Sequence, residues 1–420
     1  MDRFTAKKLG ANSTRWHPGR PVLPFAASFP RRPPLFRVGL NATALAPPLT
    51  GIGNYVVNLV MALQASGEVE LRLFDGAHWR EAPRDALAEG APRRQSRLRQ
   101  LVKPFVPFKR ELRRLRQQAA FTRGARAERI DVYHEPNYVA FASEVPIVTT
   151  IHDLSWLRYP QTHPRDRVRW LVRAVPRTLE RAAAILVDSD FVRDEVIAAF
   201  GCPPGRVHTA HLGVARSFHP RSAAQTAPTL VALRLQHGSY VLSIGTIEPR
   251  KNVEHALDAY ALLPQSLRDR HPLVIAGMPG WRATALEKRL RLLATRGDVR
   301  FLGEVGAAAL PLLYAGAAAF VFPSLYEGFG LPPLEAMASG VPVLVANRAS
   351  LPEVAGDAAL LLDPDVPEAT ARQLRSLLED DDARRCWSER ARRRAAAYTW
   401  EACARRTIDA YRGALQAGRG

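Results

Sequence analysis

Short apolar runs alternate with amphipathic stretches from Leu35 to the end of the chain, and this alternation constrains the fold more than any other feature. The apolar runs predict buried strands, and the stretches between them have helical spacing. Strand–helix alternation of this kind predicts parallel sheets with helices on both faces. The predicted strands form two series, 36–40, 69–74, 131–134, 146–151, 184–187 and 207–211, then 240–244, 273–276, 299–302, 319–322, 341–345 and 359–362.

Two such series predict two Rossmann-like α/β domains that face each other across a cleft, and 420 residues are enough for both. Residues 1–34 are basic and rich in proline, and we expect them to be a disordered tail. The N-terminal domain is expected over 35–225 and the C-terminal domain over 226–396. A last helix within 397–420 is predicted, and its pattern allows it to pack on either domain.

The net charge of +19 is concentrated in two segments, residues 1–37 and 91–129. The rest of the chain is almost neutral, which argues against a nucleic-acid binder that carries its charge along a folded face. No apolar stretch approaches the length of a membrane-spanning helix. Cys202, Cys386 and Cys403 form no CxxC pair, so we expect no zinc cluster or disulfide framework and a reducing, cytoplasmic setting.

The segment 322–335, FPSLYEGFGLPPLE, runs from a predicted strand into a predicted helix. Gly328 and Gly330 let backbone N–H groups approach an anion, and a helix start with free N–H groups is a phosphate site. Glu327 and Glu335 are carboxylates that accept hydrogen bonds from sugar hydroxyls. The alternative is a structural glycine turn with two unrelated glutamates.

Four further residues follow the carboxyl ends of predicted strands, where ligands of open α/β sheets bind. Arg250 and Lys251 follow the strand 240–244 and suit a diphosphate, although an exposed basic pair is the favoured interpretation of this motif taken alone. Gly51 belongs to a short glycine turn, and His152 ends the strand 146–151. Both of these also have a purely structural interpretation.

The sequence Asp188-Ser189-Asp190 matches the metal-binding DxD pattern of some sugar transferases. It follows a strand and opens a predicted helix, so helix capping by Ser189 or Asp190 is the better interpretation. The chain has no GxxxxGK[ST] segment, which argues against ATP-driven chemistry.

The segment GTIEPRKN, followed later in the chain by EGFGLPPLEAMASGVPV, resembles the motifs of the retaining glycosyltransferases of family 4, which have the GT-B fold. The resemblance runs from about Phe36 to Arg412. It implies a nucleotide-diphosphate-sugar donor held by the second domain and an acceptor on the first. It also implies no cofactor, no essential metal, and a last helix that crosses back onto the first domain.

The resemblance also assigns roles to residues. It implies catalytic roles for Glu327, at the donor sugar's hydroxyls, and for His152 near the sugar, and it places the Gly51 amide at the phosphate. The donor-binding positions in the second domain are Arg250, Lys251, Gly328, Phe329, Gly330, Leu331 and Glu335, with Glu335 on the nucleotide ribose and Lys251 on the diphosphate. The chain has Gly245-Thr246 where many members have Gly-Arg, so Arg250 is expected to replace a missing phosphate arginine.

The versions TIEPRKN and HDLSWLRYP look most like bacterial mannosyltransferases that build O-antigens and exopolysaccharides. The expected reaction is transfer of a hexose, mannose from GDP-mannose, to a lipid-linked glycan in cell-surface polysaccharide synthesis. The alternatives are a UDP-sugar donor, a sugar epimerase of the same fold, and a non-enzymatic protein that binds nucleotides or nucleic acid.

The basic segment 91–129 carries Leu112, Leu115 and Ala119 at helical spacing among arginines. A basic amphipathic segment binds anionic lipid, which would bring the site to a lipid-linked acceptor. We therefore expect an enzyme on the inner face of the cytoplasmic membrane. Binding of RNA or DNA and a solvated insertion are the two alternatives for this segment.

Overall fold

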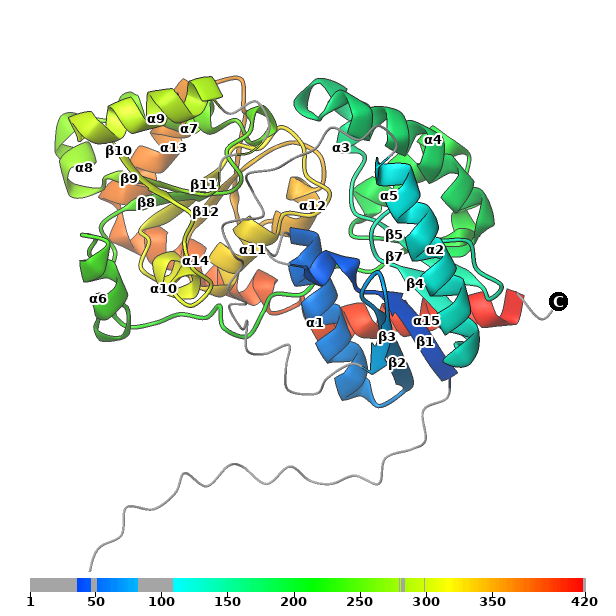
Figure 1. Cartoon of the computed structure of the whole chain (residues 1–420). Helices are drawn as coiled ribbons and strands as arrows, with labels where there is room; N and C mark the ends of the chain where they lie inside the picture. The colour runs from blue at the N-terminus through cyan, green and yellow to red at the C-terminus, as the bar shows by residue number, and fades with distance from the viewer. Residues whose placement is uncertain are drawn as a thin grey trace, which may run out of the picture.

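The computed structural model describes residues 36–46, 51–81, 109–278, 280, 284–297 and 299–417. The expected tail 1–34 and most of the first half of the basic segment lie outside these ranges. Two parallel-sheet lobes lie side by side, and both sheets carry helices on their faces (Figure 1). The predicted fold class, two Rossmann-like α/β domains, is confirmed.

The first domain contains a seven-stranded sheet in the order β3-β2-β1-β4-β5-β6-β7, parallel except for the β2–β3 pair. Its elements are β1 (Phe36–Asn41), α1 (Gly51–Ser66), β2 (Val69–Phe74), β3 (Trp79–Glu81), α2 (Lys109–Ala127), β4 (Val132–Glu135), β5 (Ile147–Ile151), α3 (Ser155–Arg158), α4 (Arg165–Arg181), β6 (Ala182–Val187), α5 (Asp190–Phe200) and β7 (Val207–Thr209). Central strands such as β5 are buried along their whole length, which explains their continuous apolar sequence.

The antiparallel edge strand β3 was not predicted, because its sequence Trp79-Arg-Glu has no apolar run. Tertiary contacts hold it in place. The Trp79 indole donates a hydrogen bond to the Phe121 carbonyl of α2, 3.2 Å away. A Cβ on Gly124 of α2 would lie 2.0 Å from the Trp79 ring, so this helix needs glycine where it covers the edge strand.

The second domain contains a six-stranded parallel sheet in the order β10-β9-β8-β11-β12-β13. Its elements are α6 (Ala223–Ala232), β8 (Val241–Ile244), α7 (Val253–Ala261), α8 (Gln265–Arg270), β9 (Leu273–Ala276), α9 (Thr284–Arg296), β10 (Val299–Gly303), α10 (Leu310–Ala315), β11 (Ala319–Phe322), α11 (Leu331–Ala338), β12 (Val343–Ala346), α12 (Leu351–Ala355), β13 (Leu360–Leu362), α13 (Pro367–Glu379) and α14 (Asp381–Ala395).

The predicted domain boundary at 225/226 falls inside helix α6. Ser222 and Gln225 form a capping box at its start, and the helix packs against α10 of the second domain. The second domain therefore begins at about Ser222. The apolar pattern did not predict this helix, because Pro228 and the polar residues around it interrupt the helical spacing.

The last helix, α15 (Trp400–Ala417), leaves the second domain and packs on α1 and on β4 to β7 of the first, as expected from the family resemblance (Figure 1). Its Tyr411 hydroxyl lies 2.7 Å from Nδ1 of the buried His134 in β4. The chain passes between the domains twice, and the two crossing segments lie side by side. The Val214 amide of the first donates a hydrogen bond to the Tyr398 carbonyl of the second, 3.2 Å away. A Cβ at Gly213 would lie 2.1 Å from the backbone nitrogen of Trp400, so only glycine fits there.

Candidate active site

The chemically important residues lie at the carboxyl ends of the strands, on both sides of the contact between the domains. In each sheet the strand order reverses beside the first strand of its domain, between β1 and β4 and between β8 and β11. Loops that leave such a switch point diverge and leave room for a ligand. Lys251 follows β8 and Glu327 follows β11, so the second domain's switch point carries the strongest sequence motifs.

Three successive carbonyl groups of the β11–α11 loop (residues 323–330) are held by serine hydroxyls. Ser350 Oγ lies 2.8 Å from the Glu327 carbonyl and 3.0 Å from the Phe329 carbonyl. Ser189 Oγ of the first domain donates to the Gly328 carbonyl over 2.7 Å. The carbonyl groups of Glu327, Gly328 and Phe329 therefore all have serine partners, which fix the backbone of this turn.

The N–H groups of Gly328, Phe329 and Gly330 donate to no group among the described residues. Helix α11 starts directly after them, at Leu331, and Gly330 reaches its N-cap conformation at φ 112°. Free N–H groups ahead of a helix start bind anions. The loop thus has the geometry that the sequence predicts for a phosphate site.

The carboxylate of Glu327 is buried and surrounded by donors. It lies 2.5 Å from Lys251 Nζ, 2.6 Å from Ser324 Oγ and 3.4 Å from Arg250 Nη1. Burial alone would raise the pKa of Glu327, but the charges of Lys251 and Arg250 lower it. The structure therefore brings together three residues that the sequence places in two separate motifs.

Arg250 and Lys251 differ in what else they contact. The Arg250 guanidinium also binds the Tyr326 carbonyl at 2.5 Å and Glu248 at 2.7 Å, so it ties the loop after β8 to the loop after β11. Lys251 Nζ has Glu327 as its partner and lies 5.4 Å from the centre of the Phe322 ring. Of these two cations, Lys251 is the one with the fewer contacts to break before it can meet a ligand.

Glu335 lies further along α11 and is half-buried, away from the Glu327 cluster. Burial raises the pKa of Glu335 to about 7. The Tyr314 hydroxyl of α10 opposes this shift, although it makes no hydrogen bond of normal geometry. The ionised form of this carboxyl accepts hydrogen bonds more strongly than the protonated form, so a role on the ribose hydroxyls would depend on pH near neutrality.

On the first domain, His152 directly follows β5, as expected, and its two ring nitrogens both face acceptors. Nδ1 lies 2.8 Å from the Asp188 carboxylate, and Nε2 lies 2.8 Å from the Pro136 carbonyl. Burial alone would lower the pKa of His152, but these acceptors, Asp188 first, raise it. Both nitrogens therefore pair with first-domain groups, which fix the orientation of the ring at the end of β5.

Gly51 is the first residue of α1, where the sequence suggests a turn after the first strand. It is exposed, and a Cβ there would meet nothing within 4 Å. Tyr55, one helical turn later, packs its ring 4.7 Å from that of His152. The start of α1 thus lies on the same side of the first domain as His152.

The domains touch where the β11–α11 loop meets the end of β5. A Cβ on Gly328 would lie 1.8 Å from the His152 carbonyl oxygen and 2.9 Å from the Asp153 Cβ. Gly328 is therefore needed for a close backbone approach between domains, a role that the sequence motif does not reveal. Tyr326 adds a second contact, since its hydroxyl accepts a hydrogen bond from the Leu154 amide at 2.9 Å.

Asp188 and Ser189 belong to the DxD-like segment, for which the sequence predicts helix capping and no metal site. Ser189 is the N-cap of α5, as predicted, and accepts a hydrogen bond from the Val192 amide. Asp188 instead holds His152. The spacing of His152 and Asp188 at the ends of neighbouring parallel strands was the available signal for this pair.

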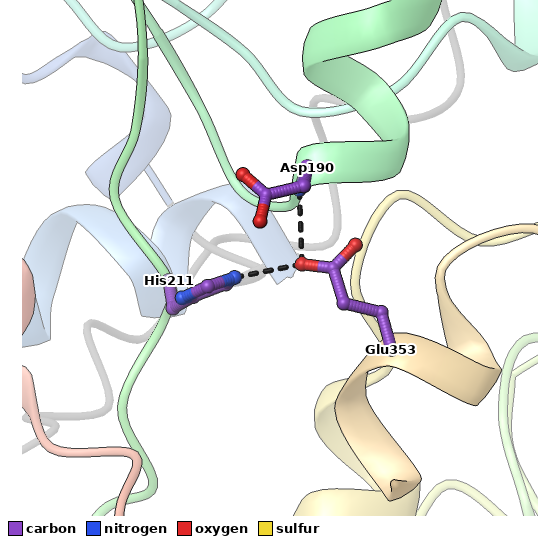
Figure 2. A group of neighbouring side chains, drawn as sticks. All are labelled: Asp190, His211 and Glu353. Carbon is purple, nitrogen blue, oxygen red and sulfur yellow. Dashed lines mark hydrogen bonds and ion pairs between the residues drawn. The ribbon is translucent and has the colours of Figure 1, made fainter.

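Asp190, His211 and Glu353 form a further polar cluster between the domains, with one ligand atom from each within 4.8 Å of the others. Figure 2 shows their side chains converging, with Glu353 reaching across from the second domain.

Among the helices of the described ranges, none is long and apolar enough to cross a membrane.

Two α/β domains with their strand ends in contact and a helix that crosses back define the GT-B fold. Solved structures confirm the fold. Sucrose-phosphate synthase from Thermosynechococcus elongatus superposes with a TM-score of 0.69 at 20% identity, covering 91% of this chain and 100% of the other. An Anabaena protein solved with UDP and glucose superposes with a TM-score of 0.66 at 17% identity, covering 89% and 98%.

Sequence comparison gives the family. The model for glycosyltransferase family 4 matches residues 49–218, and that for group 1 glycosyl transferases matches residues 234–394. O-antigen chain mannosyltransferase B of Escherichia coli is 40% identical over 372 residues, which are 87% of this chain and 96% of that protein. The chain belongs to the family 4 glycosyltransferases, as its motifs indicate, and it is a hexosyltransferase.

Proposed function

We propose that the enzyme transfers mannose from GDP-mannose to a hydroxyl of a lipid-linked glycan, with retention of configuration, during synthesis of a cell-surface polysaccharide. The name of the Escherichia coli relative, which aligns over nearly its whole length, supports mannosyl transfer. The structural observation that carries the proposal is the buried Glu327–Lys251 pair beside three unpaired N–H groups of the β11–α11 loop.

The leaving diphosphate develops negative charge as its bond to the sugar breaks. The N–H groups ahead of α11 are fixed donors at that point, and Lys251, released in part from Glu327, adds a positive charge, so together they stabilise the charge on the diphosphate. Glu327 keeps Lys251 in place and accepts hydrogen bonds from the donor sugar. The His152 side chain, fixed by Asp188, lies on the opposite wall of the site.

We propose that these groups replace a divalent cation, so that transfer proceeds in EDTA. Asp190, His211 and Glu353 have the chemistry of metal ligands, but Glu353 already pairs with His211 and with backbone amides, and the Asp190 carboxylate accepts a hydrogen bond from the Thr209 hydroxyl. Full activity after chelation supports this part of the proposal, and restoration by added Mg²⁺ or Mn²⁺ would overturn it.

The donor is tested first by thermal-shift titration with GDP, UDP, ADP and their common sugar conjugates, without metal. A selective rise in Tm with GDP and GDP-mannose is the expected result. Stabilisation by UDP compounds alone would discard GDP-mannose and keep the glycosyltransferase assignment. Transfer of labelled mannose to a lipid-linked acceptor then tests the reaction itself.

The acceptor's lipid is expected to be reached through α2 of the first domain. Leu112 and Leu115 of this helix are 50% and 67% exposed, and they alternate with arginines. Arg114 fixes the opposite side of α2, because it donates to the Val139 carbonyl at 2.9 Å and its guanidinium lies 4.7 Å from the centre of the Phe141 ring. Each cation near an anionic surface contributes about 1 kcal/mol.

Sedimentation with vesicles tests this membrane contact. The protein is expected to bind vesicles that contain anionic lipid and to leave neutral vesicles in the supernatant. Leu112→Ser with Leu115→Ser should weaken binding, whereas Leu292→Ser, at a leucine of α9 that is 51% exposed, should not. Equal binding to both vesicle types would overturn the contact, and retention on RNA or DNA instead would favour the nucleic-acid alternative.

A further inference from the structure

Glu353 of α12 binds the start of helix α5 in the other domain. Its Oε1 accepts a hydrogen bond from the Asp190 amide at 2.9 Å, and its Oε2 accepts one from the Phe191 amide at 3.0 Å. His211 Nε2 lies 2.7 Å from the same Oε1. Figure 2 shows the carboxylate of Glu353 turned toward both partners.

Helix α5 has unpaired amides at its start that need an acceptor. Ser189, its own N-cap, takes only the Val192 amide. The first two amides of the helix are taken by Glu353, which belongs to the second domain. Separation of the domains would therefore leave both amides and the carboxylate without these partners.

The same two helix starts hold the β11–α11 loop. Ser350, directly before α12, holds two carbonyls of this loop, and Ser189, directly before α5, holds the carbonyl of Gly328 between them. Glu353 joins α12 to α5. The loop is thus held from both domains, and the Glu353 contact fixes the distance between the two holding groups.

Glu353 is itself fixed from the region where the chain crosses between the domains. Its carbonyl accepts a hydrogen bond from Arg394 Nη2 at 2.6 Å and lies 3.4 Å from the Tyr398 hydroxyl. Burial alone would raise the pKa of Glu353, but the hydrogen bonds from His211 and from the two α5 amides lower it. The carboxylate therefore remains ionised while the domains are together.

We infer that Glu353 is a positioning residue for sugar transfer: by binding the start of α5 across the domain interface, it holds the β11–α11 loop against His152 in the working position. Glu353 touches neither the sugar nor the phosphate in this assignment. The inference rests on the proposed function only for its activity readout, because closure of the domains can be measured without substrate.

The test compares wild type with Glu353→Ala, Glu353→Gln and the control Glu304→Gln, an exposed glutamate of the same domain. Small-angle X-ray scattering gives the radius of gyration of each protein, alone and with GDP or UDP. We expect Glu353→Ala to be more expanded than wild type, and Glu353→Gln, which keeps one acceptor oxygen, to lie between them. The control should match wild type.

Kinetics give the second readout. Glu353→Ala should lose roughly tenfold or more in kcat while nucleotide affinity changes by less than about threefold, since Glu353 makes its contacts with Asp190, Phe191 and His211 and not with Lys251 or Glu335. A purely structural role would lower Tm and affinity together. Equal radii of gyration and equal kcat for wild type and Glu353→Ala would overturn the inference. Different radii with no mannose transfer by either protein would retain the inference and reject the proposed donor.

Discussion

Replacing Gly328 by alanine should separate domain closure from donor binding. The added Cβ would lie 1.8 Å from the His152 carbonyl oxygen, whereas ordinary contacts begin at 3.4 Å. The loop and the end of β5 would have to move apart by about 1.6 Å to make room. Neither partner can yield alone, because Gly328 is also tied to Ser189 and His152 to Asp188.

A displacement of this size in the reacting geometry costs about a hundredfold in rate, or about 2.7 kcal/mol of transition-state stabilisation. We therefore expect Gly328→Ala to lower kcat/KM for mannose transfer by about two orders of magnitude. Its Tm should stay close to that of wild type, because the clash lies between the domains and not inside either core.

The assay is the initial rate of transfer, with nucleotide affinity measured by calorimetry on the same preparation. Gly306→Ala is the matched control, since Gly306 is exposed and a Cβ there meets nothing within 4 Å. Wild-type turnover by Gly328→Ala would refute the reasoning, because it would mean that the contact between Gly328 and His152 is absent from the working enzyme.

Three further substitutions test the groups around the donor. Lys251→Met, which keeps much of the side-chain volume, should lower kcat/KM by about a hundredfold because it removes a fixed donor to the leaving diphosphate; unchanged rates would contradict that role. Glu327→Gln should lower turnover more than donor affinity, which single-turnover rates and calorimetry would separate. Wild-type nucleotide affinity should increase as pH rises through about 7, where the Glu335 carboxyl ionises, and this dependence should be absent in Glu335→Gln. The pKa of Glu335 in the folded protein lies above its ordinary value of 4.5, so the folded state holds a proton that the unfolded state loses between pH 4.5 and 7. The free energy of unfolding of wild type should therefore fall as pH rises from 4.5 to 7, relative to Glu335→Gln, and denaturant titrations would measure this.

Much of the fold follows from the sequence because buried parallel strands have a local signature. All twelve strands of the two predicted series are present, several with the predicted bounds, such as β2 and β9. The elements that were missed depend on tertiary contacts. The edge strand β3 is held by packing of Trp79 on α2, and α6 carries Pro228 within its helix.

The site residues, like the helices and strands, include some that local sequence predicts and some that it does not. Glu327, Arg250 and Lys251 were predicted as site residues from side-chain chemistry at strand ends, and the structure brings them together. Ser189 and Glu353 act on backbone groups of the opposite domain. A hydrogen bond to a backbone amide or carbonyl requires no particular residue at its other end, so no pair of motifs in the sequence reveals it.

The charges of the site are balanced before any donor arrives. Lys251 and Arg250 are paired with Glu327 and Glu248 in a buried setting. A diphosphate that binds there must therefore compete with Glu327 for Lys251, and this competition limits how tightly the donor is held in the ground state. As the bond to the sugar breaks, the charge on the diphosphate grows, while the charge on Glu327 does not. If Lys251 meets the diphosphate as proposed, the balance then shifts toward the phosphate, and the Glu327–Lys251 pair would favour the transition state over the bound donor.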